Sequence, residues 1–170
     1  MNKPYINHII IVEGNSDKNK ILSLYDADIY ICNGYDIKKE EIKLIKESSR
    51  PTIILTDPDE AGGKIRDKLQ QLIPSIDLTI DINKCNKNNK HGVAECEKEE
   101  LKRVLDQYIS DNTNDTYIDN YTFKEFLFRD SNNKNKLLKY FGLKECSNNK
   151  LLLFVRIMNL DKQELIEICK

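Results

Sequence analysis

The chain has 170 residues, of which 39% are apolar and 32% charged, so it is long enough for one domain or for one domain plus a small appendage. Its formal net charge is −1, but residues 1–120 carry 17 Lys and Arg against 22 Asp and Glu, whereas residues 121–170 carry 10 against 6. An acidic first part and a basic tail suit a protein that holds cations and binds a polyanion, although chance variation in surface charge produces the same division.

Zinc sites, disulfide frameworks and membrane segments are not expected. The five cysteines are odd in number, widely spaced and without a CxxC pair: Cys32, Cys85, Cys96, Cys146 and Cys169. The two histidines lie far apart in the sequence, so reduced thiols in a cytoplasmic protein fit best. The sequence has no basic-then-apolar leader and no apolar run near 18 residues, which argues against secretion and membrane spanning.

The first half of the chain alternates between strand and helix patterns. HIIIVEG (8–14) is a β-branched run typical of a buried strand, and Ser16 is a plausible N-cap for a helix that includes residues 19–25. DIYICNG (28–34) reads as a strand that stops at an Asn-Gly turn. The apolar spacing of 37–49 predicts a helix, which Pro51 ends.

The alternation continues through a second buried strand at 52–56, a helix at 63–73 and a further strand at 77–82. Short parallel strands joined by crossover helices satisfy this order, so we expect an α/β fold with a central, mostly parallel four-stranded sheet flanked by helices. Ligands of such sheets bind beyond the carboxyl ends of the strands. Glu13 and the Asp57/Asp59 pair both fall at such ends, so acids from two strands should share one edge of the sheet.

The rest of the chain is predicted to be helical after a polar, basic loop at 83–92. A helix is expected at 97–109, and residues 110–120 are rich in Asn, Asp, Ser and Thr, as in linkers. Thr122 and Ser131 or Asn132 are candidate N-caps in the tail, and Gly142 is a candidate helix stop. The predicted domains are therefore 1–110 (catalytic), 111–120 (linker) and 121–170 (a small, basic, all-helical RNA-binding domain).

The segment IILTDPDEAGGKIRDKL (53–69) places three carboxylates where a strand gives way to a helix. Asp57 and Asp59 at a rigid strand end suit Mg²⁺, which prefers a few carboxylates, waters and a substrate phosphate. Pro58 stiffens the loop, and Glu13 is placed to complete the site as a ligand or general acid/base. The structural alternative is a simple turn followed by an N-cap, a role that Asp also favours.

Two motifs resemble the Toprim domain, a metal-dependent catalytic module of topoisomerases, primases and small nucleases. EGNSD supplies Glu13, Gly14 and Asp17, and DPDEAG supplies Asp57, Asp59 and Gly62. Between them, Gly34 stands where the family carries a turn glycine. The resemblance implies that Glu13 is the general acid/base, that Asp57 and Asp59 bind Mg²⁺, for which Mn²⁺ can substitute, and that Asp17 lies within reach of the ion.

Within the Toprim proteins, the chain resembles the ribonuclease M5 family, which matures the precursor of 5S ribosomal RNA. The resemblance is strong over the first 70 residues and looser afterwards. The family's Gly-Val-Glu stretch is Gly92-Val93-Ala94 here, and the nearest acid is Glu95, a possible third acid one position further on. The departure indicates either a local shift of the alignment or a weakened metal site.

This resemblance implies an endoribonuclease that cuts double-helical parts of precursor 5S ribosomal RNA, acting as a cytoplasmic monomer with the large-subunit ribosomal protein that binds 5S RNA as an expected partner. No membrane is involved. A-form RNA is recognised largely through its backbone, so basic residues along one face are sufficient. For each single lysine the plainer interpretation is a solvated surface residue. The candidate phosphate contacts are Gly14, Gly34, Gly62, Lys64, Arg66, Lys87, Lys90, Lys136, Lys150 and Arg156.

Three alternatives stay open. One is another Toprim enzyme, such as a nuclease acting on DNA, and a second is a non-catalytic assembly factor that binds 5S RNA, which Ala94 favours. A third is an α/β phosphatase or receiver-type domain, but Glu13-Gly14 after the first strand does not fit it. The tail aromatics are expected to form the core of the small domain rather than base-stacking surfaces: Tyr121, Phe123, Phe126, Phe128, Tyr140, Phe141 and Phe154.

Overall fold

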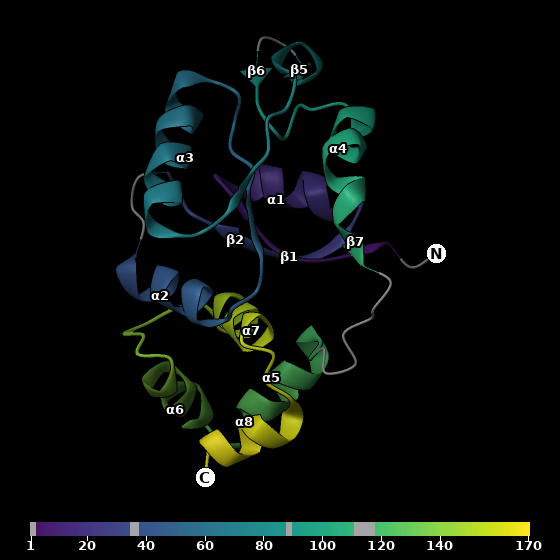
Figure 1. The fold of residues 1–170 in the computed structure, drawn as a ribbon. Helices are drawn as coiled ribbons and strands as arrows, with labels where there is room; N and C mark the ends of the chain where they lie inside the picture. The colour runs from purple at the N-terminus through teal and green to yellow at the C-terminus, as the bar shows by residue number, and fades with distance from the viewer. Residues whose placement is uncertain (1–2, 35–37, 88–89, 111–117) are drawn as a thin grey trace. The chain divides into compact units, whose positions relative to one another are not determined.

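The chain forms two compact units. The structure, a computed structural model, describes residues 3–34, 38–87, 90–110 and 118–170 (Figure 1). Unit 1 comprises residues 1–37 and 50–113, and unit 2 comprises 38–49 and 114–170. Most of the predicted linker, 111–117, and the first residue of the predicted helix at 37–49 lie outside the described residues. No helix among the described residues is long and apolar enough to cross a membrane.

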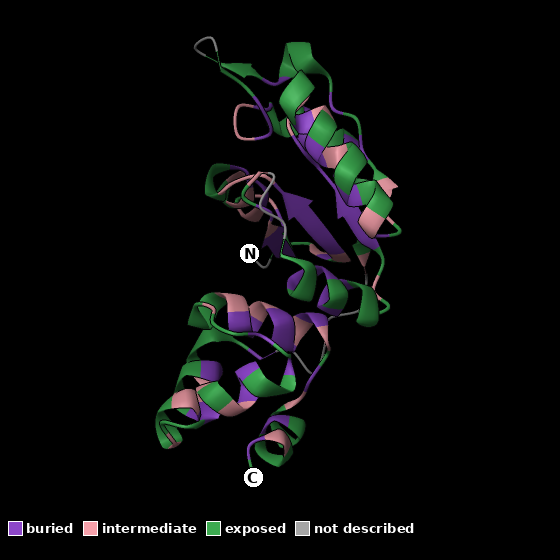
Figure 2. Ribbon diagram, turned by 90° about the vertical axis from the view of Figure 1, so that its left-hand side faces the viewer, coloured by how far each residue is buried: buried purple, intermediate pink, exposed green. Residues whose placement is uncertain are grey.

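Unit 1 is built on the predicted parallel sheet. Its strand order is β2-β1-β3-β4, with β1 at Tyr5–Val12, β2 at Asp26–Ile31, β3 at Thr52–Ile54 and β4 at Ile76–Asp77. All three contacts along this path are parallel, which confirms the predicted topology. Figure 2 shows the strands as buried, as expected of β-branched runs covered on both faces.

The structure corrects the ends of the predicted sheet. The strand expected at 77–82 has only two paired residues, and the helix expected at 97–109 ends at Leu105. After a 3₁₀ turn, η2 at Asp106–Tyr108, the strand β7 at Ile109–Ser110 pairs antiparallel with the beginning of β1. A two-residue strand has too little periodicity to be predicted from its sequence.

Three helices and a small hairpin complete unit 1. The helices are α1 (Asn15–Leu22), α3 (Glu60–Leu72) and α4 (Lys98–Leu105). Helix α1 begins after Gly14 and not after the predicted cap Ser16. The stretch predicted as a loop contains η1 (Ile82–Lys84) and the strands β5 (Asn86–Lys87) and β6 (Lys90–His91), which pair with each other. Their polar side chains are exposed, so backbone pairing rather than burial forms this hairpin.

The core of unit 1 joins one face of the sheet to α1 and α4. Ile6, Ile10 and Val12 alternate along β1 and pack in one cluster with residues that include Ile21 of α1 and Leu101 of α4. The cluster also contains Cys85 and Cys96, which the structure joins in a disulfide, whereas reduced thiols were expected. Cys85 and Cys96 are eleven residues apart in the sequence, and this separation alone did not predict that they would pair.

Unit 2 is all helical, as predicted for the tail. It contains α2 (Lys39–Glu47), α5 (Asn120–Arg129), α6 (Asn133–Tyr140), α7 (Asn148–Ile157) and α8 (Lys162–Ile168). Helix α2 lies between two strands of unit 1 in the sequence but packs against α7. Asp119, not Thr122, caps α5 by accepting the Thr122 N–H, and Gly142 follows α6 with φ of +67°.

The aromatic residues of unit 2 divide between core and surface. Phe123, Phe126, Phe141 and Phe154 are buried as predicted. Tyr121, Phe128 and Tyr140 are exposed by 72%, 87% and 52%, so the prediction that they belong to the core was wrong. Aromatic residues occur on several sides of α5, and the sequence pattern alone therefore did not identify its buried face.

Candidate metal centre

Two neighbouring strands bring Glu13 and Asp57 together. Ile11 of β1 pairs with Ile54 of β3 in parallel register, and each chain then continues past its strand to an acidic residue. The Asp57 N–H donates a hydrogen bond of 2.8 Å to Glu13 Oε1. The two acids that the sequence placed at one edge of the sheet are therefore in direct contact, because parallel strands end on the same side.

The loop after β3 is held close to Glu13 by a glycine. A Cβ atom on Gly62 would lie 2.2 Å from the Asp57 carbonyl oxygen and 2.8 Å from Glu13 Oε1, so no larger residue fits without moving the backbone. Asp59 is the N-cap of α3, and its Oδ1 accepts the Gly62 N–H at 2.7 Å. Asp59 thus caps a helix, which is the role that the sequence offered as the alternative to metal binding. Asp59 is exposed and is the last residue of the Asp57-Pro58-Asp59 turn.

Asp57 is also oriented from the segment after the hairpin. The Val93 N–H donates to Asp57 Oδ1 at 2.8 Å. A Cβ on the neighbouring Gly92 would lie 2.8 and 2.9 Å from the two carboxylate oxygens of Asp57. In the sequence, Gly92 and Val93 are noticed only because they match the Gly-Val of the family. Nothing in the sequence predicts that the backbone of this segment contacts Asp57.

Asp17 lies beside the same cluster. It is buried, its Oδ2 accepts the Gly14 N–H at 2.9 Å, and the Ala94 N–H also donates to it. Burial, and secondarily repulsion from Asp57, raises the pKa of Asp17 to about 6. Glu95 contributes to that repulsion, so the structure places this possible third acid within electrostatic reach of Asp17 and Asp57.

The clustered acids raise one another's pKa values. Burial is the largest cause for Glu13, followed among the charges by Asp57, Asp59 and Asp17. Burial likewise raises the pKa of Asp57, with repulsion from Asp59 and Glu95. A divalent cation would relieve this repulsion, and carboxylate oxygens at a strand end are hard ligands of the kind that Mg²⁺ prefers.

The donor set therefore fits a cation in its chemistry. Among the residues that the structure describes, however, no group of three or more His, Cys, Asp or Glu side chains is placed to hold a metal ion by itself. An open set of a few carboxylates is the arrangement in which Mg²⁺ keeps waters and takes a further ligand from a substrate phosphate.

The predicted phosphate contacts in unit 1 have different surroundings. The Arg66 guanidinium donates to the Thr56 hydroxyl at 3.1 Å and to the carbonyl oxygens of Thr56 and Asp57, so it supports the acidic loop from within. Lys64 is exposed and pairs with Glu60 at 2.6 Å. Lys87 and Lys90 are exposed on the hairpin, and Gly34 has φ of +70°, as a turn glycine requires.

The three basic candidates in unit 2 make contacts within that unit. Lys136 Nζ donates to the Cys169 carbonyl oxygen at 2.6 Å, and Arg156 Nε donates to the Ile118 carbonyl oxygen at 2.8 Å. Lys150 Nζ lies 2.8 Å from the buried carboxylate of Glu41 on α2. These contacts give each side chain a structural role that its sequence position did not reveal.

Comparisons with known proteins agree with the two motifs. The Toprim domain family matches residues 8–92. Ribonuclease M5 of Mycoplasma genitalium is 32% identical over 168 residues, which cover 94% of this chain and 92% of that protein. Ribonuclease M5 of Mesoplasma florum is 32% identical over 172 residues, covering 95% and 97%. A small TOPRIM domain protein from Bacillus stearothermophilus is 29% identical over 60% of this chain and 88% of its own, with a TM-score of 0.48.

Proposed function

Since this chain belongs to the ribonuclease M5 family of Toprim proteins, we propose that it is a metal-dependent endoribonuclease that cleaves double-helical regions of precursor 5S ribosomal RNA. The observation that best supports the chemistry is the contact between Glu13 and the backbone of Asp57, within a cluster of mutually repelling acids. Metal-dependent phosphodiester hydrolysis needs groups that hold a cation and move a proton, and carboxylates are able to do both.

The residues have distinct proposed roles. Asp57 and Asp59 hold Mg²⁺, or Mn²⁺ as a substitute, with Asp17 nearby and Glu95 as the possible third acid. The bound ion supplies charge stabilisation at the scissile phosphate. Glu13 accepts the proton of the attacking water, a role suited to a carboxylate whose pKa is raised by burial. The N–H groups of Val93 and Asp57 keep the Asp57 and Glu13 carboxylates in place.

The partners and location follow from the same proposal. Exposed Lys64, Lys87 and Lys90 lie in unit 1 and are proposed to contact RNA phosphates near the acidic cluster. Unit 2 is proposed to bind RNA as well. We propose that the protein acts in the cytoplasm as a monomer and that the large-subunit ribosomal protein that binds 5S RNA folds the substrate.

The proposal is tested by the change Asp57→Asn. We expect at least a 100-fold loss of cleavage of a precursor 5S RNA in Mg²⁺, because the isosteric amide keeps the shape of the loop and removes the charge that holds the ion. Cleavage is measured as discrete products on a denaturing gel, with the ribosomal protein added or omitted. Asp67→Asn, an exposed acid on α3, is the matched control and should cleave normally.

Two results would change the assignment. Tight RNA binding without cleavage by the unaltered chain, in Mg²⁺ or Mn²⁺ and with the ribosomal protein present, would support the non-catalytic binding factor that Ala94 favours. Cleavage of duplex DNA in preference to the RNA precursor would support another Toprim nuclease.

A further inference from the structure

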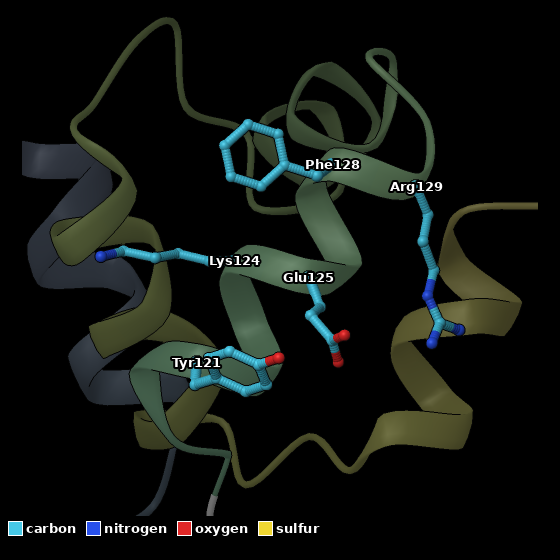
Figure 3. A pocket seen from close by; sticks show the side chains of 5 residues that line it. All are labelled: Tyr121, Lys124, Glu125, Phe128 and Arg129. Atoms are coloured by element: carbon cyan, nitrogen blue, oxygen red, sulfur yellow. The ribbon is translucent and has the colours of Figure 1, made fainter.

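Helix α5 presents two aromatic rings to solvent. Tyr121 and Phe128 are 72% and 87% exposed, and with Lys124, Glu125 and Arg129 they line a shallow hollow of about 430 Å³ (Figure 3). Phe123 and Phe126 of the same helix are buried and supply its core contacts. The two outer rings therefore contribute little to the packing of unit 2, although exposing them to water is unfavourable.

The positions of these residues define one surface. Tyr121, Lys124 and Phe128 are spaced by three and four residues, so they lie along one side of the helix. Figure 3 shows Lys124 and Arg129 extending to opposite sides of α5, with the rings between them. Two residues seven positions apart are separated by about 10 Å along a helix axis, so both rings are available to neighbouring flat groups.

The composition of the surface points to a particular ligand. Three of its five side chains are ionised, two of them cationic, and its apolar part consists of aromatic rings alone. Protein–protein interfaces are depleted of Lys and Glu, and this surface carries both, in Lys124 and Glu125. Aromatic rings flanked by Lys and Arg instead suit unpaired nucleotides, whose bases stack on the rings while their phosphates lie near the cations.

We propose that the outer face of α5 binds an unpaired stretch of the RNA substrate, with bases stacked on Tyr121 and Phe128 and phosphates beside Lys124 and Arg129. The proposal rests on the proposed function, which supplies an RNA partner, and adds that single-stranded nucleotides are recognised besides the duplex. Glu125 stands one helical turn before Arg129, so its carboxylate offsets part of the Arg129 charge and leaves Lys124 as the stronger of the two phosphate contacts.

The surface also differs from three other basic residues of unit 2. Lys136, Lys150 and Arg156 each donate to a carbonyl oxygen or carboxylate within unit 2. Their charges are thus partly engaged in holding the helices of unit 2 together. The α5 face combines cations with exposed rings, which gives it the means to distinguish unpaired bases from a continuous duplex.

The test compares Tyr121→Ala and Phe128→Ala with Tyr140→Ala, an exposed aromatic control on α6. The full chain in EDTA, which prevents cleavage, is titrated into a two-stranded RNA duplex with a single-stranded tail that carries 2-aminopurine, and into the same duplex with blunt ends. Stacking contributes about 1–3 kcal/mol per base, so each α5 variant should bind the tailed RNA roughly 5- to 160-fold more weakly, with reduced quenching of the fluorophore.

The control variant and the blunt duplex make the result specific. Tyr140→Ala should bind both RNAs as the unaltered chain does, and the α5 variants should keep their affinity for the blunt duplex. Because the rings are exposed, the melting temperatures should change little. Equal affinity and quenching for Phe128→Ala and Tyr140→Ala would overturn the proposal and would leave a protein as the alternative occupant of this surface.

A parallel cleavage assay separates this proposal from the proposed function. If the unaltered chain cleaves precursor 5S RNA but the α5 variants bind tailed RNA normally, only the α5 proposal fails. If the α5 variants lose binding to the tail while the unaltered chain cleaves no RNA, the nuclease proposal fails and the binding surface stands.

Discussion

Gly92 illustrates how one missing side chain sets the geometry of the acidic cluster. A methyl group at this position would lie within 2.9 Å of both carboxylate oxygens of Asp57, closer than non-bonded atoms tolerate. Relief requires the Asp57 carboxylate to turn away from the Val93 N–H that orients it. The shape of the site thus depends on a residue that has no functional group of its own.

We therefore expect Gly92→Ala to lower cleavage of precursor 5S RNA by at least about 10-fold, because a small displacement of a group that positions the reacting atoms is costly. RNA binding in EDTA should stay within a factor of about two, since phosphate contacts dominate affinity. Gly63→Ala is the control, because a Cβ there meets nothing within 4 Å. Equal cleavage rates for the two variants would show that Asp57 accommodates the methyl group.

At the scale of elements, helix α4 is fixed to the segment before the hairpin by one buried acid. Glu100 accepts the Asp81 N–H at 2.8 Å and two hydrogen bonds from Arg103, at 2.6 and 2.9 Å, and lies 3.6 Å from Lys84 Nζ. The hydrogen bonds from Arg103 are the largest cause of a pKa lowered to about 2. Glu100 thereby ties the start of α4 to residues 81–84, from which the hairpin and then Gly92 follow.

This contact makes stability depend on pH in a defined direction. A carboxyl group whose pKa is lower in the folded chain stabilises it above the unfolded pKa, near 4.5, and loses that contribution as the pH falls towards 2. Glu100→Gln should cost about 2 kcal/mol of unfolding free energy at pH 7 and much less at pH 3. Urea unfolding at both pH values measures this, with exposed Glu99→Gln as the control. A cost that is the same at both pH values would exclude a charge effect.

At the scale of the whole molecule, buried strands were the most predictable feature. The runs at 8–14 and 52–56 identified adjacent parallel strands, and their shared direction was enough to predict that Glu13 and Asp57 lie together. The hydrogen bond from the Val93 N–H to Asp57 spans 36 positions, and the sequence does not indicate which backbone N–H groups donate to a side chain. The packing of α2 against α7 likewise depends on a long-range pair, Glu41 with Lys150, that neither segment reveals alone.

The distribution of cations across the molecule leads to a last prediction. Lys87 and Lys90 are exposed on the hairpin, whereas Lys150 is largely covered and paired with a buried carboxylate. Each lysine that neutralises an RNA phosphate contributes nearly one to the slope of log affinity against log salt concentration. Lys87→Gln combined with Lys90→Gln should reduce that slope by about 1–2 and leave the melting temperature nearly unchanged.

Lys150→Gln should behave in the opposite way. It removes the 2.8 Å contact with the buried Glu41 carboxylate and leaves the more distant Lys38 Nζ, at 4.0 Å, as an ion-pair partner of Glu41. The loss of this charged hydrogen bond costs about 2 kcal/mol, so the chain should melt at a lower temperature while the salt dependence of RNA binding is retained. Fluorescence anisotropy over a range of salt concentrations and thermal unfolding of the same samples measure the two quantities. A lower slope for Lys150→Gln with unchanged melting would show that this lysine contacts RNA after all, because a lysine engaged only within unit 2 releases no counterions from the substrate.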